Sequence, residues 1–159
     1  MKLPRTIRLD PSDTNVFPLA AEPGEWAVTG TFAFADVDPA AFTQKQKLAF
    51  KSGWLGVGSF GRSTFVQVAV IPDGEYEKTV RRLAAHLHEN YGAPDMLAAA
   101  EAARAEAEYA AGLCNHPAGT LLAVDREFTD EGVAERIRVM PKQGEGTHAR
   151  IWSVEKDDD

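Results

Sequence analysis

The sequence predicts an α+β fold in a single domain with a mainly antiparallel sheet. Strand-like segments gather near both ends of the chain, and the two clearest helical patterns lie between them. The length of 159 residues suits one domain with a sizeable core. We expect the domain to span residues 1–154, with about three helices packed on the sheet, and residues 155–159 to form an acidic flexible tail.

Two strands and one helix are predicted in the first third of the chain. Residues 3–9 form a short strand that ends before Pro11. Residues 26–35 alternate between larger side chains, among them aromatic ones, and smaller side chains, and therefore predict a longer strand. Asp38 followed by proline is the pattern of a helix N-cap and first turn, so residues 39–50 are predicted to be helical.

One strand and two helices follow in the middle of the chain. Residues 64–71 form a strand that a Pro-Asp-Gly turn ends. Residues 75–90 carry apolar side chains at spacings of three and four, which predicts an amphipathic helix. Asp95 is expected to cap a helix over residues 96–111, whose alanine-rich stripe lets a neighbouring element approach closely.

The C-terminal third is predicted to be a three-stranded meander. Residues 120–128 and 133–140 flank a four-residue turn, and residues 148–154 form the third strand. The register that this turn imposes brings opposite charges together on both faces of the hairpin, which supports it. The predicted cross-strand pairs are Arg126 with Glu135 and Asp125 with Arg136.

The composition narrows the classes of function. Seventeen Lys and Arg residues against 24 Asp and Glu give a net charge of −7, which predicts no nucleic-acid partner because a phosphate backbone requires a concentrated basic face. No secretory signal and no membrane-spanning apolar run is recognised, so no membrane association is expected. The single cysteine cannot form an internal disulfide, which indicates a reducing compartment and hence a cytoplasmic protein.

Residues 56–61 read GVGSFG and match the GxGxxG spacing of phosphate-binding loops. A dinucleotide-binding turn needs a strand before the glycines and a helix after them, whereas here a predicted helix precedes and a strand follows. The kinase version of the loop is excluded because the chain lacks the strand lysine and the HRD and DFG motifs. The match alone therefore predicts no nucleotide site.

Two interpretations of the loop over residues 53–63 stay open. In the favoured, structural one, the glycines make a tight helix-to-strand connection with apolar side chains tucked under it. In the other, backbone N–H groups at Gly58 and Gly61 cradle an anion or ligand, which Arg62 and Ser63 also reach.

A second candidate site lies at Cys114 and His116. A thiolate activated by an imidazole would be a nucleophile, but no residue that would orient His116 is identified. A lone cysteine is more often a small buried hydrophobe, and this interpretation is favoured. The four histidines and one cysteine lack the spacing of zinc ligands, so no metal site is predicted and no cofactor is identified.

Four segments of the chain resemble an uncharacterised family of small alphaproteobacterial proteins. They are MKLPRTIRLDPSDT, EPGEWAVTGTFAF, GSFGRSTFV and LCNHPAGTLLAVDREFTDEGV. The resemblance spans most of the chain and supplies no catalytic residues. It implies an accessory role, because the family's members look like neighbours of genes for molybdenum- or iron–sulfur-dependent redox enzymes.

The first functional hypothesis is a non-enzymatic binding or accessory protein with a protein partner, assisting a redox-enzyme system. Its contact surface is a sheet face or the glycine loop, where Trp54, Phe60 and Arg62 are residue types that dominate interfaces. The alternative is a small enzyme or ligand-binding domain with a pocket between residues 53–63 and 114–116. A homo-oligomer formed through an exposed sheet edge is a third alternative.

Overall fold

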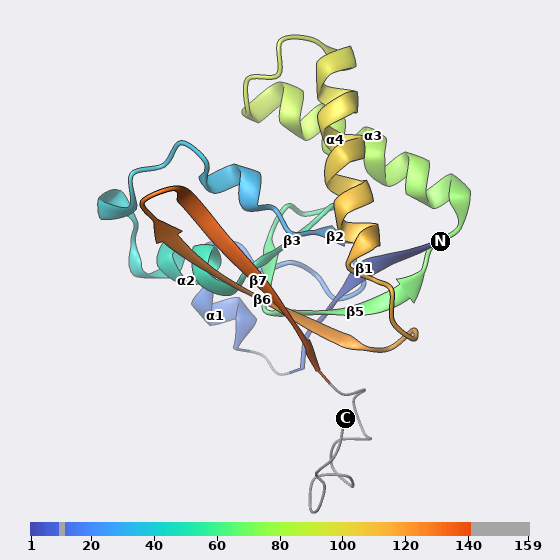
Figure 1. The fold of residues 1–159 in the computed structure, drawn as a ribbon, viewed down its shortest axis with the longest axis horizontal. Coiled ribbons are helices and arrows are strands. Elements are labelled where there is room, and N and C mark those ends of the chain that lie inside the picture. Colours follow the sequence, from blue (N-terminus) through green and yellow to red (C-terminus); the bar gives the residue numbers. More distant parts are fainter. Residues whose placement is uncertain (10–11, 141–159) are drawn as a thin grey trace, which may run out of the picture.

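Two antiparallel sheets form the β part of the computed structural model, which describes residues 1–9 and 12–140 (Figure 1). The larger sheet has the strand order β1-β5-β6-β7, formed by β1 (Lys2–Ile7), β5 (Phe65–Val70), β6 (Leu121–Thr129) and β7 (Gly132–Met140). The smaller sheet has the order β2-β3-β4, formed by β2 (Ala27–Val28), β3 (Trp54–Gly56) and β4 (Arg62–Ser63). The predicted α+β fold with a mainly antiparallel sheet is confirmed.

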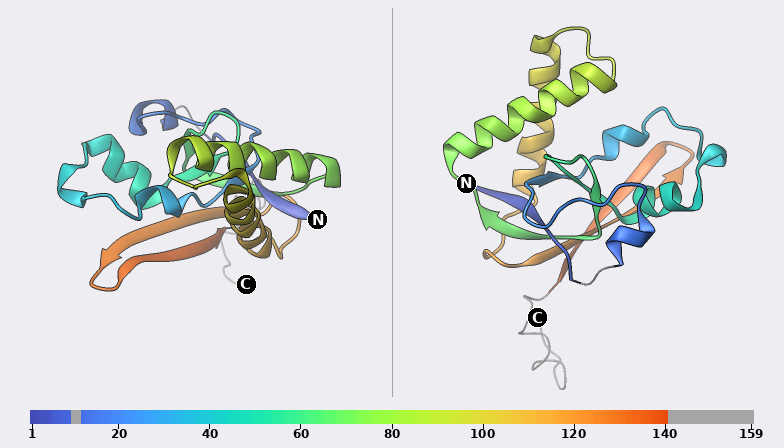
Figure 2. Two further views of the ribbon diagram at one scale, coloured as in Figure 1. Left: turned by 90° about the horizontal axis from the view of Figure 1, so that it is seen from above. Right: turned by 180° about the vertical axis from the view of Figure 1, so that it is seen from behind.

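Four α-helices and two short 3₁₀ helices complete the described part of the chain. The α-helices are α1 (Asp13–Val16), α2 (Gln44–Ser52), α3 (Asp73–Asn90) and α4 (Met96–Gly112). The 3₁₀ helices η1 (Thr31–Phe34) and η2 (Pro39–Ala41) lie between β2 and α2. In Figure 2, α3 and α4 cross each other at one end of the molecule, and the β6–β7 hairpin extends away from them toward α2.

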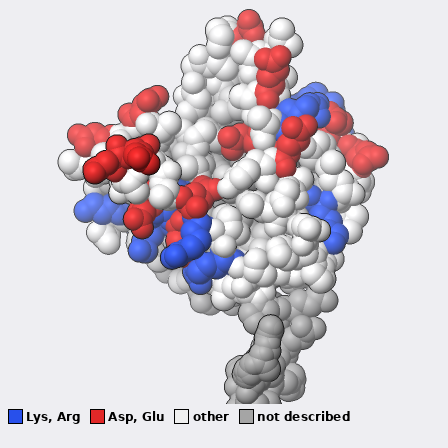
Figure 3. Space-filling model, viewed as in Figure 1, with Lys and Arg blue, Asp and Glu red and all other residues white. Residues whose placement is uncertain are grey.

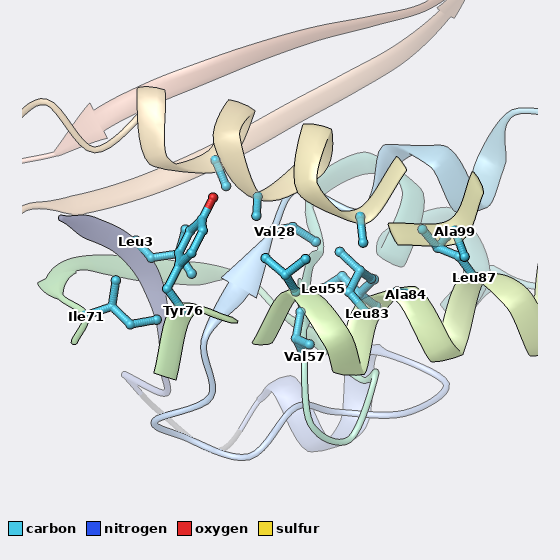
Figure 4. Close-up of a cluster of buried hydrophobic side chains, with 14 residues drawn as sticks. Leu3, Val28, Leu55, Val57, Ile71, Tyr76, Leu83, Ala84, Leu87 and Ala99 are labelled. Carbon is cyan, nitrogen blue, oxygen red and sulfur yellow. The ribbon is translucent and has the colours of Figure 1, made fainter. Parts of the chain in front are cut away.

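The main hydrophobic core lies where α3 and α4 pack on each other and on the strands beneath them (Figure 4). Leu83 of α3 and Leu3 of β1 are fully buried there, and Leu55 of β3 is buried beside them. The predicted small-residue stripe of α4 is buried as well, so the buried face of this helix packs on its neighbours through methyl groups. Its fully buried members are Ala99, Ala103, Ala107 and Ala110.

Two smaller clusters hold the rest of the molecule together. One lies where the small sheet packs on the large one, and it contains Trp54 of β3 beside Val66 and Leu122. The other surrounds α2 and is aromatic, with Phe34 packed edge-on against Phe50 at a centroid distance of 5.2 Å. Edge-to-face packing of this kind is favourable because the positive ring edge meets the negative ring face.

The predicted register of the β6–β7 hairpin is confirmed. Arg126 lies opposite Glu135, and its Nε is 3.4 Å from Glu135 Oε1. Asp125 lies opposite Arg136, but its carboxylate pairs with Arg138 at 2.7 Å, since a diagonal neighbour is within reach of a long side chain. The third meander strand predicted over residues 148–154 and the tail over residues 155–159 lie outside the described residues.

The single strand predicted over residues 26–35 is wrong beyond Val28. Gly30 adopts a φ of 75°, and η1 follows it directly. A Cβ on Gly30 would lie 2.5 Å from Leu55 Cβ and 2.7 Å from Arg62 Nη1. The chain therefore turns at a position where only glycine fits, and the aromatic residues that suggested a strand face pack around α2 and α3 instead.

The single helix predicted over residues 39–50 is divided into η2 and α2. Asp38 caps the first piece as expected, accepting a hydrogen bond from the Ala40 N–H. Thr43 then begins α2 with a capping box: its hydroxyl accepts from the Gln46 N–H, and the Gln46 side chain accepts from the Thr43 N–H. This second cap satisfies the first donors of a new helix, which favours a break before it.

The packing of α3 predicts the effect of a core truncation. Leu83→Ala should lower the free energy of unfolding by about 2–5 kcal/mol, because it leaves a cavity at a fully buried position. Leu97→Ala is the matched control, since Leu97 is 71% exposed and the change should stay within about 0.5 kcal/mol. Urea unfolding followed by circular dichroism measures both, and equal effects of the two variants would contradict the assigned core.

Candidate functional site

The glycine loop is the turn of a small β-hairpin, which corrects the predicted helix-to-strand connection. β3 follows α2 directly and pairs with β4, and residues 57–61 join the two strands. The Gly56 N–H donates to the Gly61 carbonyl at 2.9 Å, and the Phe60 N–H donates to the Gly56 carbonyl at 3.0 Å. Neither strand exceeds three residues, so no alternation in the sequence marks them.

This hairpin cradles a carboxylate of its own chain. Glu25 Oε1 accepts a hydrogen bond from the Ser59 N–H at 2.8 Å, and Oε2 accepts from the Ser59 hydroxyl at 2.7 Å. Oε2 also accepts from the Glu22 N–H at 2.6 Å. A Cβ on Gly56 or Gly58 would lie 2.6 Å or 2.8 Å from Glu25 Oε1, so both positions are glycine where the carboxylate approaches the backbone.

The residues expected to reach an external anion here point elsewhere. Ser63 is buried, and its hydroxyl lies 2.8 Å from the Phe65 carbonyl and 3.3 Å from that of Ile7. Gly61 is buried against the segment before β2, where a Cβ would come within 2.5 Å of the Ala20 carbonyl carbon. Arg62 extends away from Glu25, toward α2 and η1. The turn thus binds the carboxylate of Glu25 through the groups that would otherwise face an external anion.

Trp54 is fully buried, so its predicted role in an exposed contact surface is wrong. Its indole packs in the cluster between the two sheets, beside Ala27, Val68 and Cys114. The indole Nε1 is buried without a hydrogen-bond partner among the described residues. The position directly after α2 turns this side chain inward, and the size of the residue fills the space between the sheets.

Two buried arginines meet beneath the hairpin at the C-terminal end of α2. Arg126 donates from Nη1 to the Phe50 carbonyl at 2.8 Å and to the Gly53 carbonyl at 3.0 Å. Its Nη2 donates to the Thr29 carbonyl, and its Nε–H is shared between Thr31 and Glu135. The bonds from Nη1 pair carbonyl groups at the C-terminal end of α2, which the helix itself leaves unpaired and which form its negative pole.

Arg62 reaches the same place from β4. Its Nη1 lies 3.2 Å from the Gly53 carbonyl and 3.4 Å from the Thr29 carbonyl, and its Nη2 lies 3.2 Å from the Gly30 carbonyl. Burial, together with the positive charge of Arg126, lowers the pKa of Arg62 to about 9. Arg62 is therefore still cationic at neutral pH, although its surroundings disfavour the charge.

An aromatic hollow of about 290 Å³ opens above Arg62. The Phe34 ring forms part of its wall, with Arg62 Cζ 4.7 Å from the ring centroid. Phe60 and Tyr91 line it from the hairpin and from the end of α3. We call this site the aromatic hollow; its lining residues are Pro18, Leu19, Ala33, Phe34, Val37, Phe42, Gln46, Ala49, Phe60, Arg62 and Tyr91.

Phe60 has a constrained backbone at the mouth of this hollow. Its φ of 59° is the only positive value at a non-glycine residue in the described part of the chain. The ring stacks on the His86 imidazole at a centroid distance of 3.7 Å, and burial lowers the pKa of His86. A left-handed phenylalanine is uncommon and is often associated with a functional site.

Cys114 and His116 do not form the predicted second site. The Cys114 side chain is 1% exposed in the apolar cluster between the sheets, and burial raises its pKa to about 12. His116 is half-buried, and its carbonyl accepts a hydrogen bond from Lys2 Nζ at 2.7 Å. Neither residue lines the aromatic hollow, so the pocket expected between residues 53–63 and 114–116 is not the one that the hairpin borders.

The remaining charged groups lie mainly at the surface. On the face that Figure 3 shows, acidic and basic side chains are interspersed. Within residues 1–9 and 12–140, no group of three or more His, Cys, Asp or Glu side chains could hold a metal ion. In the same residues no helix is long and apolar enough to cross a membrane.

Comparison with known families agrees with the resemblance seen in the sequence. A family model covers residues 1–157, which is almost the whole chain. The chain belongs to DUF6505, a family of unknown function. No curated protein and no solved structure matches this DUF6505 member.

Most residues that line the aromatic hollow of this DUF6505 member were not recognised as site residues in the sequence. Phe34 falls in the strand predicted over residues 26–35 and Phe42 in the helix predicted over residues 39–50. Tyr91, which is 46% exposed, directly follows the helix predicted over residues 75–90. Of the predicted site residues, only Phe60 and Arg62 line the hollow. The sequence does contain a signal that Tyr91 lies beyond the helix: it directly precedes Gly92, and a glycine with positive φ is typical of the residue that follows a helix end.

The hairpin packing predicts that Gly61 tolerates no side chain. Gly61→Ala should lower the free energy of unfolding by about 1–3 kcal/mol, because its Cβ would clash with backbone atoms that cannot move independently. Gly74→Ala is the matched control in α3: no atom lies within 4 Å of its added Cβ, and the change should be neutral or slightly stabilising. Chemical denaturation measures both, and an unaffected Gly61→Ala variant would contradict the close approach to Ala20.

The burial of Cys114 predicts an unreactive thiol. At pH 8 the folded protein should react with iodoacetamide roughly a hundredfold or more slowly than the urea-unfolded chain, because a raised pKa leaves little thiolate and the side chain is sealed. Mass spectrometry of quenched samples measures the rate. Rapid alkylation of the folded protein would restore Cys114 as a candidate nucleophile.

Proposed function

We propose that this DUF6505 member is a binding protein without a catalytic reaction of its own, and that the aromatic hollow receives an apolar group of its ligand. The observation that carries the proposal is the hollow itself, a concavity of about 290 Å³ lined largely by aromatic and aliphatic side chains. Binding sites for small molecules and for anchoring side chains share this character.

The rim of the hollow supports the proposal. Leu19, Val37 and Tyr91 are 54%, 38% and 46% exposed, so apolar surface continues from the interior of the hollow onto its edge. Scattered exposed apolar residues need no explanation, but these three gather around one concavity. A ligand that fills the hollow would cover them as well.

The polar groups of the hollow favour binding of a ligand over catalysis. They are the Arg62 guanidinium, the Gln46 amide and the Tyr91 hydroxyl. Among the described lining residues there is no carboxylate, thiol or imidazole, which are the usual general bases and nucleophiles. The wider setting in the cytoplasm, a protein partner and assistance to a redox-enzyme system remain predictions from the sequence.

Binding of a small neutral aromatic compound tests the proposal. 3-Phenylpropanamide should bind with a Kd of roughly millimolar order, as expected for a compound of its size. Two-dimensional NMR titration of the full chain measures the affinity and locates the site through shifted signals of the lining residues. Shifts confined to surfaces outside the hollow would contradict the proposal.

A variant that fills the hollow gives the matching control. Ala33→Met places a longer side chain in the wall and should weaken binding of 3-phenylpropanamide about tenfold or more by occupying its space. Ala102→Met introduces the same side chain at an exposed position of α4 outside the hollow and should leave the affinity unchanged. Equal affinities for the two variants would place the compound elsewhere.

A further inference from the structure

Arg62 is a buried cation at the wall of the aromatic hollow. The residue is 8% exposed, yet it lines the hollow together with Phe34, whose ring its guanidinium faces. Gly30 and Gly53 make room for its side chain, since a Cβ at either position would lie 2.7 Å or 3.0 Å from an Arg62 atom. The position of this charge is therefore part of how the small sheet and α2 are packed.

The charge of Arg62 lacks the partner that Arg126 has. Arg126 forms an ion pair with Glu135, whereas no carboxylate of residues 1–9 or 12–140 forms an ion pair with Arg62. The three carbonyl oxygens around Arg62 are neutral and lie at 3.2–3.4 Å, at or beyond the long end of the usual range for such hydrogen bonds. All of these bonds come from Nη1 and Nη2, and none comes from Nε.

We infer that the ligand of the aromatic hollow is an apolar group that carries a single carboxylate, and that this carboxylate accepts hydrogen bonds from Arg62. The inference rests on the proposed function, because it names the ligand class of the same site. A buried cation that lacks an ionic partner is costly, and a carboxylate compensates it with charge-assisted hydrogen bonds. The lowered pKa of Arg62 agrees with this cost, because burial disfavours the charged form of the guanidinium.

The number of charges favours a carboxylate over a phosphate. A phosphate monoester carries about −1.5 to −2 charges and three strong acceptor oxygens, which would require more donors than one guanidinium. In the described residues, Arg62 is the only cationic side chain that lines the hollow, beside one amide and one phenol. The aromatic walls then accommodate the apolar part, such as a phenyl ring on a short chain.

A matched pair of probes tests the inference on the unmodified full chain. 3-Phenylpropanoate and 3-phenylpropanamide have the same apolar part and differ in charge, so their affinities isolate the role of Arg62. The acid should bind at least about tenfold more tightly than the amide, as expected for charge-assisted hydrogen bonds with a buried guanidinium. The Arg62 Nε–H signal in NMR spectra should shift with the acid and stay unchanged with the amide.

Two arginine variants separate this role from a general effect of charge. Arg62→Met should bring the acid and the amide to equal affinity. Arg104→Met removes an exposed cation on α4 that does not line the hollow, and should leave the preference for the acid unchanged. If Arg62→Met does not fold, the affinities and the Nε–H signal of the unmodified protein still decide the question.

The carboxylate can come from a free acid or from the C-terminus of a peptide, and two further probes distinguish these sources. They are a Ser-Gly-Gly-Phe peptide with a free C-terminus and the same peptide as its amide. Tighter binding of the free acid than of its amide in either pair supports the inference, and the pair that shows it identifies the source. Equal affinities within both pairs would overturn the inference while leaving the proposed function intact, and no binding by any probe would overturn both.

Discussion

Arg62 on β4 and Arg126 on β6 donate hydrogen bonds to the same two carbonyl groups, those of Thr29 and Gly53. Thr29 directly follows β2, and Gly53 caps α2, so the two guanidinium groups join the small sheet, α2 and the large sheet. Buried carbonyl groups that are not paired within a helix or sheet need a hydrogen-bond donor, and a guanidinium supplies several N–H donors in one plane. The positions of η1 and of the aromatic cluster around α2 depend on this junction, and so does the hollow that they border.

Two charged side chains next to the glycine hairpin, the half-buried Glu25 and the buried Arg62, have different surroundings. Glu25 receives three hydrogen bonds from Ser59 and Glu22, and the turn of the hairpin closes around it. Arg62 donates only to neutral carbonyl groups, at 3.2–3.4 Å, whereas the neighbouring Arg126 also has an ion pair with Glu135. The carboxylate of Glu25 therefore has its hydrogen-bond partners within the chain, whereas the guanidinium of Arg62 lines the hollow without an ionic partner among the described residues. This asymmetry connects the packing of the hairpin with the ligand class inferred for the site.

The elements that could be predicted from the sequence are those with long local periodicity. The stripe of α3, the cap of α4 at Asp95 and the charge pairs across the β6–β7 hairpin involve residues close together along the chain. The small sheet has strands of two and three residues, which leave no periodic pattern. The carboxylate that the glycine turn holds comes from Glu25, 34 residues before Ser59, and nothing in the turn itself specifies it.

The order and spacing of residues along the sequence determined the α+β class, the main helices, the hairpin register and membership of a family of unknown function. The tertiary structure decided which residues of the glycine segment are accessible: Trp54 is sealed between the sheets, whereas Phe60 and Arg62 line the hollow. It likewise placed Cys114 in an apolar cluster and brought Phe34, Phe42 and Tyr91 together from three elements. The reason is physical: periodicity and capping act between near neighbours, but burial depends on the surfaces that distant segments present to each other.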